Sequence, residues 1–180
     1  ARGQFEVARL CGVRRIVLRT SGAVYGHYPK VWKDAEEPVT MDSLPKADTI
    51  FGASQLFNER VAELFAERYG VDYIGLRLSS IYGFGRGERR TAPRDIYDEL
   101  IECPVLEDHF VAPPANQRFA WTYVGDAAEA LVRALKVDKP PVRIFNMTGE
   151  VRTAAETVNF IKTLAPIGKV EFGQAPVRRL

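Results

Sequence analysis

The sequence predicts an α/β fold in which short apolar strands alternate with helices and form a parallel sheet that is covered on both faces. Residues 15–18 (RIVL), 72–79 and 142–147 are short, apolar runs with the length and composition of buried strands. Between them, residues 53–69 have helical periodicity and stop at Gly70, a natural helix end. Strand–helix alternation of this kind is typical of parallel sheets flanked by helices.

Caps, turn residues and periodicity predict the remaining elements. The chain opens on a helical face, and prolines make residues 26–50 and 104–118 irregular. The other expected elements are a helix over 94–102, a strand over 119–124, a helix N-capped by Asp126, a helix over the residues after Thr153 with Glu156 as capping-box partner, and a strand over 169–172.

The helix over residues 53–69 is expected to bury one apolar face. Its apolar residues that recur at helical spacing are Phe57, Val61, Leu64 and Phe65. The charged residues between them, including Glu59, are expected on the other side of the helix.

Composition excludes several classes of protein. Hydrophobic residues make up 46% and charged residues 27% of the 180, which is a globular and not a disordered mixture. A net charge of +2 gives no reason to expect nucleic-acid or membrane binding, and no apolar run approaches the ~20 residues of a membrane span. Cys11 and Cys103 are too few for a disulfide framework or a metal site, so we expect a reducing, cytoplasmic setting.

Two stretches combine position with chemistry. Ser21 follows the first strand, where the ligands of open α/β sheets collect, although serine and glycine are also ordinary turn residues. Positions 51 and 55 share one helix face further along the chain. A tyrosine and a lysine there would form a general base with a lowered pKa. Phe51 and Gln55 carry neither group, and a helix start that packs on the core explains them equally well.

A glycine-rich loop, residues 82–87 (YGFGRG), follows the strand at 72–79. It lacks the GxGxxG spacing and the immediate helix of a dinucleotide fingerprint, so we reject that interpretation. Its arginines, among them Arg86 and Arg89, suit a diphosphate, or they form a solvated basic loop. Neither HExxH nor a Walker loop is present, and His27 and His109 are isolated.

Five ordered stretches together resemble the extended short-chain dehydrogenase/reductase family, the NAD-dependent epimerase/dehydratase group. They are RRIVLRTSGAVYG, FGASQLFNER, LRLSSIYGFG, YVGDAAEAL and IFNMTGE. The first is similar to the family's strand and serine loop, and the second to its Tyr-Gly-x-Ser-Lys helix start. The others are similar to its Leu-Arg-x-x-Asn-Val-Tyr-Gly, Tyr-Val-Asp-Asp-Val-Ala and Tyr-Asn-Ile-Gly segments.

The resemblance implies a Rossmann-like parallel sheet with a small C-terminal substrate-binding lobe. It also implies an internal piece, because the family's glycine-rich NAD loop and first βαβ units, about 100 residues, would precede residue 1. Residues 1–180 would then form one partial domain. Residues 1–82 and 119–147 would complete the sheet, and residues 83–118 and 148–180 would form the substrate lobe.

The resemblance also assigns residues to the site. Ser21 would be the catalytic hydroxyl, with Thr20 beside it on the cofactor side. Phe51 falls on the family's catalytic tyrosine, and Gln55 on the lysine that binds the cofactor ribose and lowers the tyrosine pKa. The proton-transfer chemistry of this site would therefore be impaired.

The substrate contacts also depart from the family pattern. Ser80 replaces an asparagine expected near the nucleotide. Arg118 stands one position earlier than the family's arginine, which in a strand means the opposite face. Arg86 and Arg89 would then supply the diphosphate contact.

Two functions stay open. The first is an NAD- or NADP-dependent nucleotide-sugar epimerase or dehydratase with impaired catalysis. The second is a non-catalytic, sugar-nucleotide-binding or regulatory member of the fold, or a degenerate fragment. The resemblance further implies a homodimer through the helix at 53–69.

Overall fold

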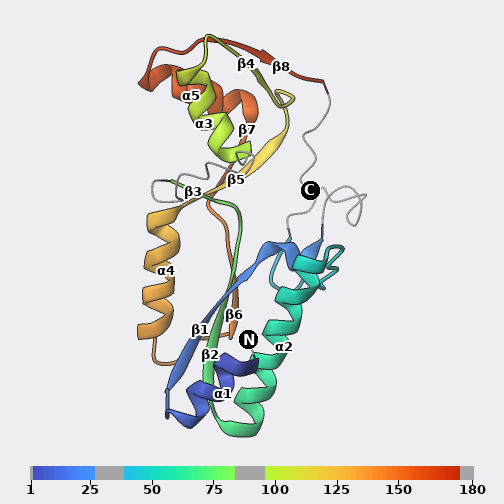
Figure 1. The fold of residues 1–180 in the computed structure, drawn as a ribbon, viewed down its shortest axis with the longest axis vertical. Coiled ribbons are helices and arrows are strands. Elements are labelled where there is room, and N and C mark those ends of the chain that lie inside the picture. The colour runs from blue at the N-terminus through green and yellow to red at the C-terminus, as the bar shows by residue number, and fades with distance from the viewer. Residues whose placement is uncertain (1, 27–38, 84–95, 175–180) are drawn as a thin grey trace. The chain divides into compact units, whose positions relative to one another are not determined.

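The computed structural model confirms the α/β class (Figure 1). It describes residues 2–26, 39–83 and 96–174. The chain divides into two compact units: unit 1 comprises Ala1–Ser79 with Gly125–Thr148, and unit 2 comprises Ser80–Val124 with Gly149–Leu180. Each unit has its own sheet and its own core, and the two are described in turn.

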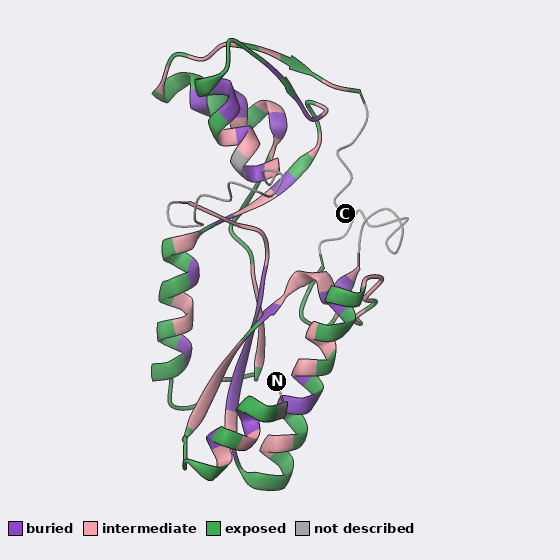
Figure 2. Ribbon diagram, in the orientation of Figure 1, coloured by how far each residue is buried: buried purple, intermediate pink, exposed green. Residues whose placement is uncertain are grey.

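Unit 1 is built on a three-stranded parallel sheet. Its strands β1 (Arg15–Ser21), β2 (Asp72–Leu78) and β6 (Ile144–Met147) lie in the order β1-β2-β6. The central strand β2 is buried from Tyr73 to Leu78 (Figure 2). Ser21 is in register with Leu78, and Leu78 with Met147, so the carboxyl ends of all three strands meet at one edge.

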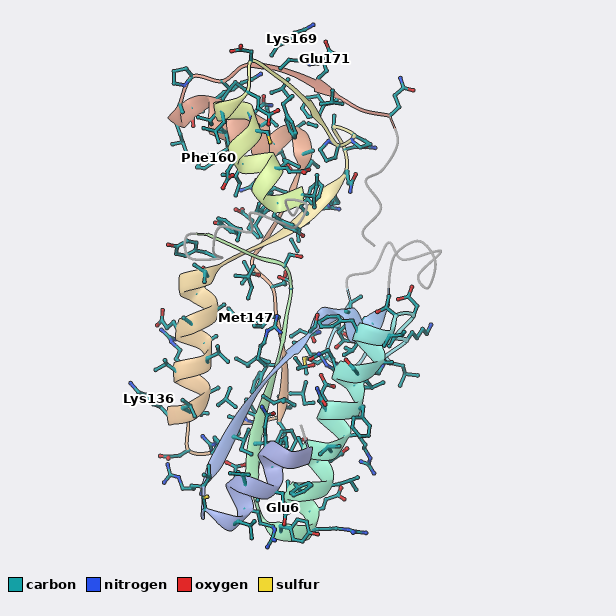
Figure 3. The ribbon with its side chains drawn as sticks, in the orientation of Figure 1. Glu6, Lys136, Met147, Phe160, Lys169 and Glu171 are labelled. Carbon is teal, nitrogen blue, oxygen red and sulfur yellow. The ribbon has the colours of Figure 1, made fainter. Side chains whose placement is uncertain are left out.

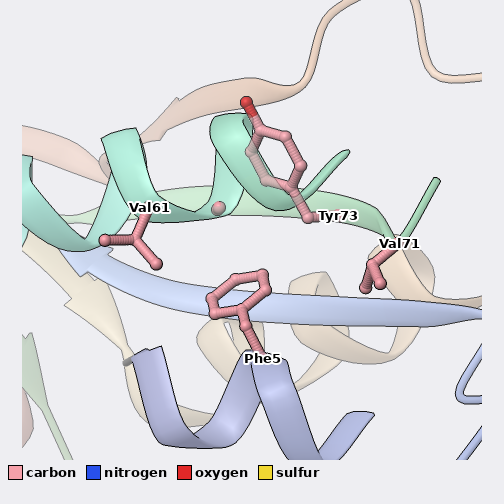
Figure 4. Close-up of a cluster of buried hydrophobic side chains, with 5 residues drawn as sticks. Phe5, Val61, Val71 and Tyr73 are labelled. Carbon is pink, nitrogen blue, oxygen red and sulfur yellow. The ribbon is translucent and has the colours of Figure 1, made fainter. Parts of the chain in front are cut away.

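Three helices cover this sheet: α1 (Arg2–Leu10), α2 (Ile50–Tyr69) and α4 (Val124–Lys136). In Figure 1, α1 and α2 lie on one side of the strands and α4 on the other. Phe5, Val61, Val71 and Tyr73 meet in the core between α1, α2 and the sheet (Figure 4). The guanidinium of Arg15 donates to the Ala134 carbonyl at 3.2 Å, which ties α4 to β1.

Helix α2 begins at residue 50, three residues before the predicted start. Thr49 is its N-cap, and the Thr49 hydroxyl accepts a hydrogen bond from the Gly52 N–H at 3.0 Å. The predicted stop is confirmed, because Gly70 adopts a left-handed conformation with φ of 66°.

The predicted buried face of α2 is partly wrong. Val61 is buried, but Phe57 is 63% exposed and Leu64 is 38% exposed. Glu59, expected at the surface, is only 4% exposed. Apolar residues lie on both sides of this helix, so the sequence pattern alone does not identify which side packs against the sheet. Burial of Glu59 is tolerated because its charge is paired with Arg77.

Helix α4 also begins earlier than predicted. It starts at Val124, so Asp126 lies in its first turn and is not its N-cap. A carboxylate in the first turn still favours the helix, since the N-terminus carries partial positive charge.

Unit 2 combines a mixed sheet, a parallel strand pair and two helices. The mixed sheet contains β3 (Ile81–Tyr82), β5 (Arg118–Tyr123) and β7 (Glu150–Thr153), with β5 in the centre. The pair is β4 (His109–Ala112) with β8 (Lys169–Phe172), and the helices are α3 (Ile96–Leu106) and α5 (Ala154–Leu164). On β8, Lys169 pairs with Glu171 at 2.6 Å at the edge of the unit (Figure 3).

The predictions for unit 2 are mixed. Thr153 does cap α5, and its capping box with Glu156 is complete, as predicted. The strand over 169–172 is also confirmed. The prediction that residues 104–118 are irregular is wrong, because this range contains the end of α3 and the whole of β4. Strand β7 was not predicted, since its residues are mostly exposed and carry no apolar alternation.

Among the residues with a described structure, no helix is long and apolar enough to cross a membrane. The same residues contain no group of three or more His, Cys, Asp or Glu side chains that could hold a metal ion.

Candidate functional site

The carboxyl edge of the unit 1 sheet is the place where a ligand of an open α/β fold is expected. Ser21 ends β1 at this edge, and Met147 ends β6 (Figure 3). The Ser21 hydroxyl oxygen accepts a hydrogen bond from the Ala23 N–H at 3.2 Å and so caps a short 3₁₀ turn, η1 (Gly22–Tyr25). The Ser21 oxygen thus acts as the N-cap of this turn.

The first turn of α2 packs directly against η1. A Cβ atom on Gly52 would stand 2.4 Å from the Ala23 carbonyl oxygen, so only glycine allows this approach. This contact brings the start of α2, with Phe51, against the turn that follows Ser21. The structure thus joins two stretches that are 30 residues apart in the sequence.

Phe51 and Gln55 offer no acid or base at this place. Phe51 is 49% exposed and has no ionisable group, and Gln55 is half-buried with a neutral amide. Among the described residues, the Gln55 side chain has no hydrogen-bond partner. Neither side chain can act as the tyrosine–lysine pair would, because a phenyl ring and a neutral amide do not titrate near neutral pH.

Behind Ser21 lies a buried polar network that sequence reasoning did not find. The Arg77 guanidinium donates to both carboxylate oxygens of Glu59, at 3.0 and 2.7 Å. The Thr20 hydroxyl donates to the same Glu59 carboxylate at 2.8 Å, and Thr20 is fully buried. The Thr20 hydroxyl therefore points into the protein and is engaged there.

The network continues to Tyr25. Arg77 Nη1 donates to the Tyr25 hydroxyl at 2.5 Å, and its guanidinium lies 4.9 Å from the centre of the Tyr25 ring. The same hydroxyl lies 2.8 Å from Asn146 Oδ1 on β6 and 3.2 Å from the Thr40 carbonyl. One group of side chains therefore joins β1, the end of η1, α2, β2, β6 and the segment around Thr40.

Electrostatics favour the charged form of Arg77. Burial lowers the pKa of the Arg77 guanidinium, but the hydrogen bonds and charge of Glu59 outweigh burial and leave that pKa raised. Arg77 is 8% and Glu59 4% exposed, so little solvent screens the pair.

Of the predicted substrate residues in unit 2, the structure describes only Ser80 and Arg118. The Ser80 carbonyl accepts from the Thr122 N–H at 3.3 Å, near the end of β5. Arg118 begins β5 and is exposed, four residues or about 13 Å from that point along a strand. Arg86 and Arg89 lie outside the described residues, as does His27.

Comparison with known proteins supplies the family. The model of the NAD dependent epimerase/dehydratase family matches residues 4–148. A putative UDP-glucose 4-epimerase from Methanocaldococcus jannaschii is 28% identical over 160 residues, which are 87% of this chain and 49% of the relative. A uronate dehydrogenase from Pseudomonas putida is 26% identical over 98 residues, which are 54% of this chain and 35% of the relative.

Solved structures agree in fold. The UDP-glucose 4-epimerase of Thermus thermophilus, solved in complex with NAD, has a TM-score of 0.70 and 23% identity, covering 93% of this chain and 53% of its own. The chain spans 33% to 49% of the length of four curated relatives. Because the family model matches residues 4–148, which are most of the chain, this chain belongs to the NAD-dependent epimerase/dehydratase family.

Proposed function

We propose that this chain forms part of an NAD(P)-dependent nucleotide-sugar epimerase- or dehydratase-like protein whose proton-transfer chemistry is impaired. One observation carries the proposal. The start of α2 lies against the turn after Ser21 through Gly52, and we propose that Phe51 and Gln55 occupy the positions where the family's catalysis needs a titratable pair.

The relatives support a proposal for the substrate and the cofactor. A matching relative is named a putative UDP-glucose 4-epimerase, and a matching structure holds NAD. We therefore propose a nucleotide sugar as substrate and NAD or NADP as cofactor, with a free sugar acid as the alternative substrate that the uronate dehydrogenase suggests.

The residues at the sheet edge fit such a cofactor in part. When bound, a nicotinamide would accept or return a hydride at a sugar carbon. The neutral amide of Gln55 would donate to and accept from a ribose hydroxyl, but it would supply no positive charge. The Ser21 hydroxyl would donate to the sugar oxygen next to the reacting carbon. Thr20 would act only through its place beside Ser21, because its hydroxyl is bonded to Glu59.

The step that we expect to be impaired is the transfer of the sugar hydroxyl proton. Oxidation of a sugar alcohol releases the hydroxyl proton, and at neutral pH a serine hydroxyl is too weakly acidic to exchange it without a base. Phe51 has no oxygen to accept it. General acid–base catalysis contributes about 10²–10⁴-fold to rates, and we expect this chain to lack that contribution.

Unit 2 is proposed as the substrate lobe and unit 1 as the sheet that carries the cofactor side. Arg86 and Arg89 are proposed to contact the diphosphate, since guanidinium groups bind phosphate oxygens in pairs. Ser80, which directly follows the end of unit 1, is proposed to contact the nucleotide.

Restoring the titratable pair tests the proposal. Phe51→Tyr together with Gln55→Lys, in a form of the protein with the whole cofactor-binding domain, is expected to raise turnover of UDP-glucose with NAD at least about 10²-fold over the unaltered protein. The gain arises because tyrosine supplies the acid–base group and lysine lowers its pKa. NADH absorbance and product NMR measure it.

Two matched controls accompany this test. Phe57→Tyr adds a tyrosine to the same helix at an exposed position and should give no gain. Adding Ser21→Ala to the double variant should remove the gain. Family-like turnover by the unaltered protein would contradict impairment, and no gain with UDP-sugars or uronates would contradict the residue assignment. Binding of UDP-glucose by calorimetry without any turnover would instead support the non-catalytic alternative.

We also propose a homodimer through α2. Ile50, Phe57 and Leu64 are spaced seven residues apart and are 92%, 63% and 38% exposed, so they form an apolar stripe along the helix. A stripe with this spacing suits packing against the same helix of a second copy. Phe57→Glu is expected to weaken dimerisation at least about 100-fold, since it places a charge at the centre of the contact.

Light scattering coupled to size exclusion measures this effect. Leu164→Glu, which alters an equally exposed apolar residue on α5, is the control and should leave the mass of the dimer unchanged. A monomeric parent protein at tens of micromolar, or a dimer that tolerates Phe57→Glu, would contradict the proposed contact.

A further inference from the structure

The segment from Thr20 to Tyr25, which we call the Ser21 turn, joins the end of β1 to η1 and is held at both ends by the same buried ion pair. At its start, the Thr20 hydroxyl donates to Glu59 at 2.8 Å. At its end, the Tyr25 hydroxyl accepts from Arg77 at 2.5 Å. Ser21 lies between these two anchors, one residue after the first and four before the second.

The same pair also fixes α2. Glu59 stands on α2, four residues after Gln55 and eight after Phe51, so it is one and two turns further along the same side. Arg77 stands on β2, the central strand of the sheet. The Glu59 carboxylate therefore links α2 to the turn and to β2 through three hydrogen bonds.

Stability alone does not account for this arrangement. Replacing a buried ion pair by apolar side chains of similar volume is often neutral or stabilising, because the pair must be desolvated. What apolar side chains cannot replace are the directional hydrogen bonds to Thr20 and Tyr25. Other contacts place the middle of the turn, since Val24 is fully buried and its carbonyl accepts from the Lys46 N–H at 2.9 Å.

We propose that Glu59 and Arg77 are positioning residues that hold the Ser21 turn in register with positions 51 and 55 of α2. They act through Thr20 and Tyr25 and do not touch a ligand. The claim that this register matters for catalysis rests on the proposed function. The claim that the ion pair keeps the turn ordered does not.

Amide hydrogen exchange tests the order of the turn without any assay of activity. The Ala23 N–H bonds to Ser21, and the Gly26 N–H bonds to the Ala23 carbonyl at 3.2 Å, so both report the turn. In Thr20→Val with Tyr25→Phe, which removes both anchors and keeps the ion pair, exchange at Ala23 and Gly26 should be at least about tenfold faster. Exchange at Ile74 in β2 should change less than about threefold.

A second variant tests the same proposal by removing the Glu59–Arg77 ion pair. Glu59→Met with Arg77→Met is expected to give the same local acceleration at Ala23 and Gly26. The matched control, Arg60→Met with Glu63→Met, removes an exposed ion pair from the same helix and should change neither site. The conservative variant Thr20→Ser keeps the hydroxyl donor and should retain slow exchange when Tyr25 is intact.

The outcomes distinguish a role in positioning the turn from a role in the stability of unit 1 as a whole. Faster exchange confined to the turn, with retention in Thr20→Ser, supports the proposal. Unchanged exchange at Ala23 and Gly26 in the Thr20→Val, Tyr25→Phe variant would overturn it, and so would equal acceleration in the turn and in β2. A failure of Phe51→Tyr with Gln55→Lys to gain activity would leave these results unaffected.

Discussion

Arg77→Met alone is expected to lower the free energy of unfolding of unit 1 by about 3–5 kcal/mol, because it leaves a charge buried without its partner. Glu59 is 4% exposed, and without Arg77 it keeps only the hydrogen bond from Thr20. Urea unfolding followed by circular dichroism, with exchange at Ile74 as the reporter of unit 1, measures the loss.

The size of this loss is best judged against two other variants. Arg60→Met removes an arginine whose side chain is 59% exposed, and we expect a change below about 1 kcal/mol. Glu59→Met with Arg77→Met should be more stable than Arg77→Met alone, since no unpaired charge remains. A loss below about 1 kcal/mol for Arg77→Met, or a double variant that is less stable than the single one, would contradict the account of the pair.

Much of the fold was predictable because its signals are local. The strands of unit 1 are short apolar runs between turn residues, and Gly70 and the Thr153 capping box mark helix ends within a few residues. The position of Ser21 at the carboxyl edge of the sheet followed from its place directly after the first strand.

The buried network was not predictable for the opposite reason. Glu59 lies 18 residues from Arg77 and 39 from Thr20, and nothing in the local pattern pairs them. A glutamate between apolar residues of a helix is usually exposed, whereas here a distant arginine decides its burial. Only the packing of α2 on β2 makes Glu59 an interior residue and leaves Phe57 outside.

The missed strands of unit 2 show the same limit. β7 and β4 have four residues each, and β7 is largely exposed, so periodicity has almost no signal there. β7 exists because it pairs antiparallel with β5, with Trp121 opposite Glu150. Such a strand depends on its neighbour more than on its own residues.

Because β7 depends on its pairing with β5, a substitution at Gly149, just before β7, is expected to have a large effect on the stability of unit 2. Gly149→Ala is expected to destabilise unit 2 by about 3 kcal/mol, at the upper end of overpacking costs. A Cβ atom there would stand 1.7 Å from the Trp121 carbonyl oxygen and 2.8 Å from its carbon. These are backbone atoms of β5, so relief requires the two strands to move apart.

The pairing of β5 with β7 is therefore expected to fail before the core of unit 2 does. In a Trp32→Phe background, Trp121 is the sole tryptophan, and its fluorescence in urea reports unit 2. Gly3→Ala is the matched control, because a Cβ there meets nothing within 4 Å, and alanine in a helix should be neutral or slightly stabilising. If Gly149→Ala unfolds at the same urea concentration as its parent, the close approach of residue 149 to β5 is not a feature of the protein in solution. A midpoint lowered for Trp121 fluorescence, with exchange at Ile74 unchanged, would locate the damage in unit 2 and show that unit 1 folds without it.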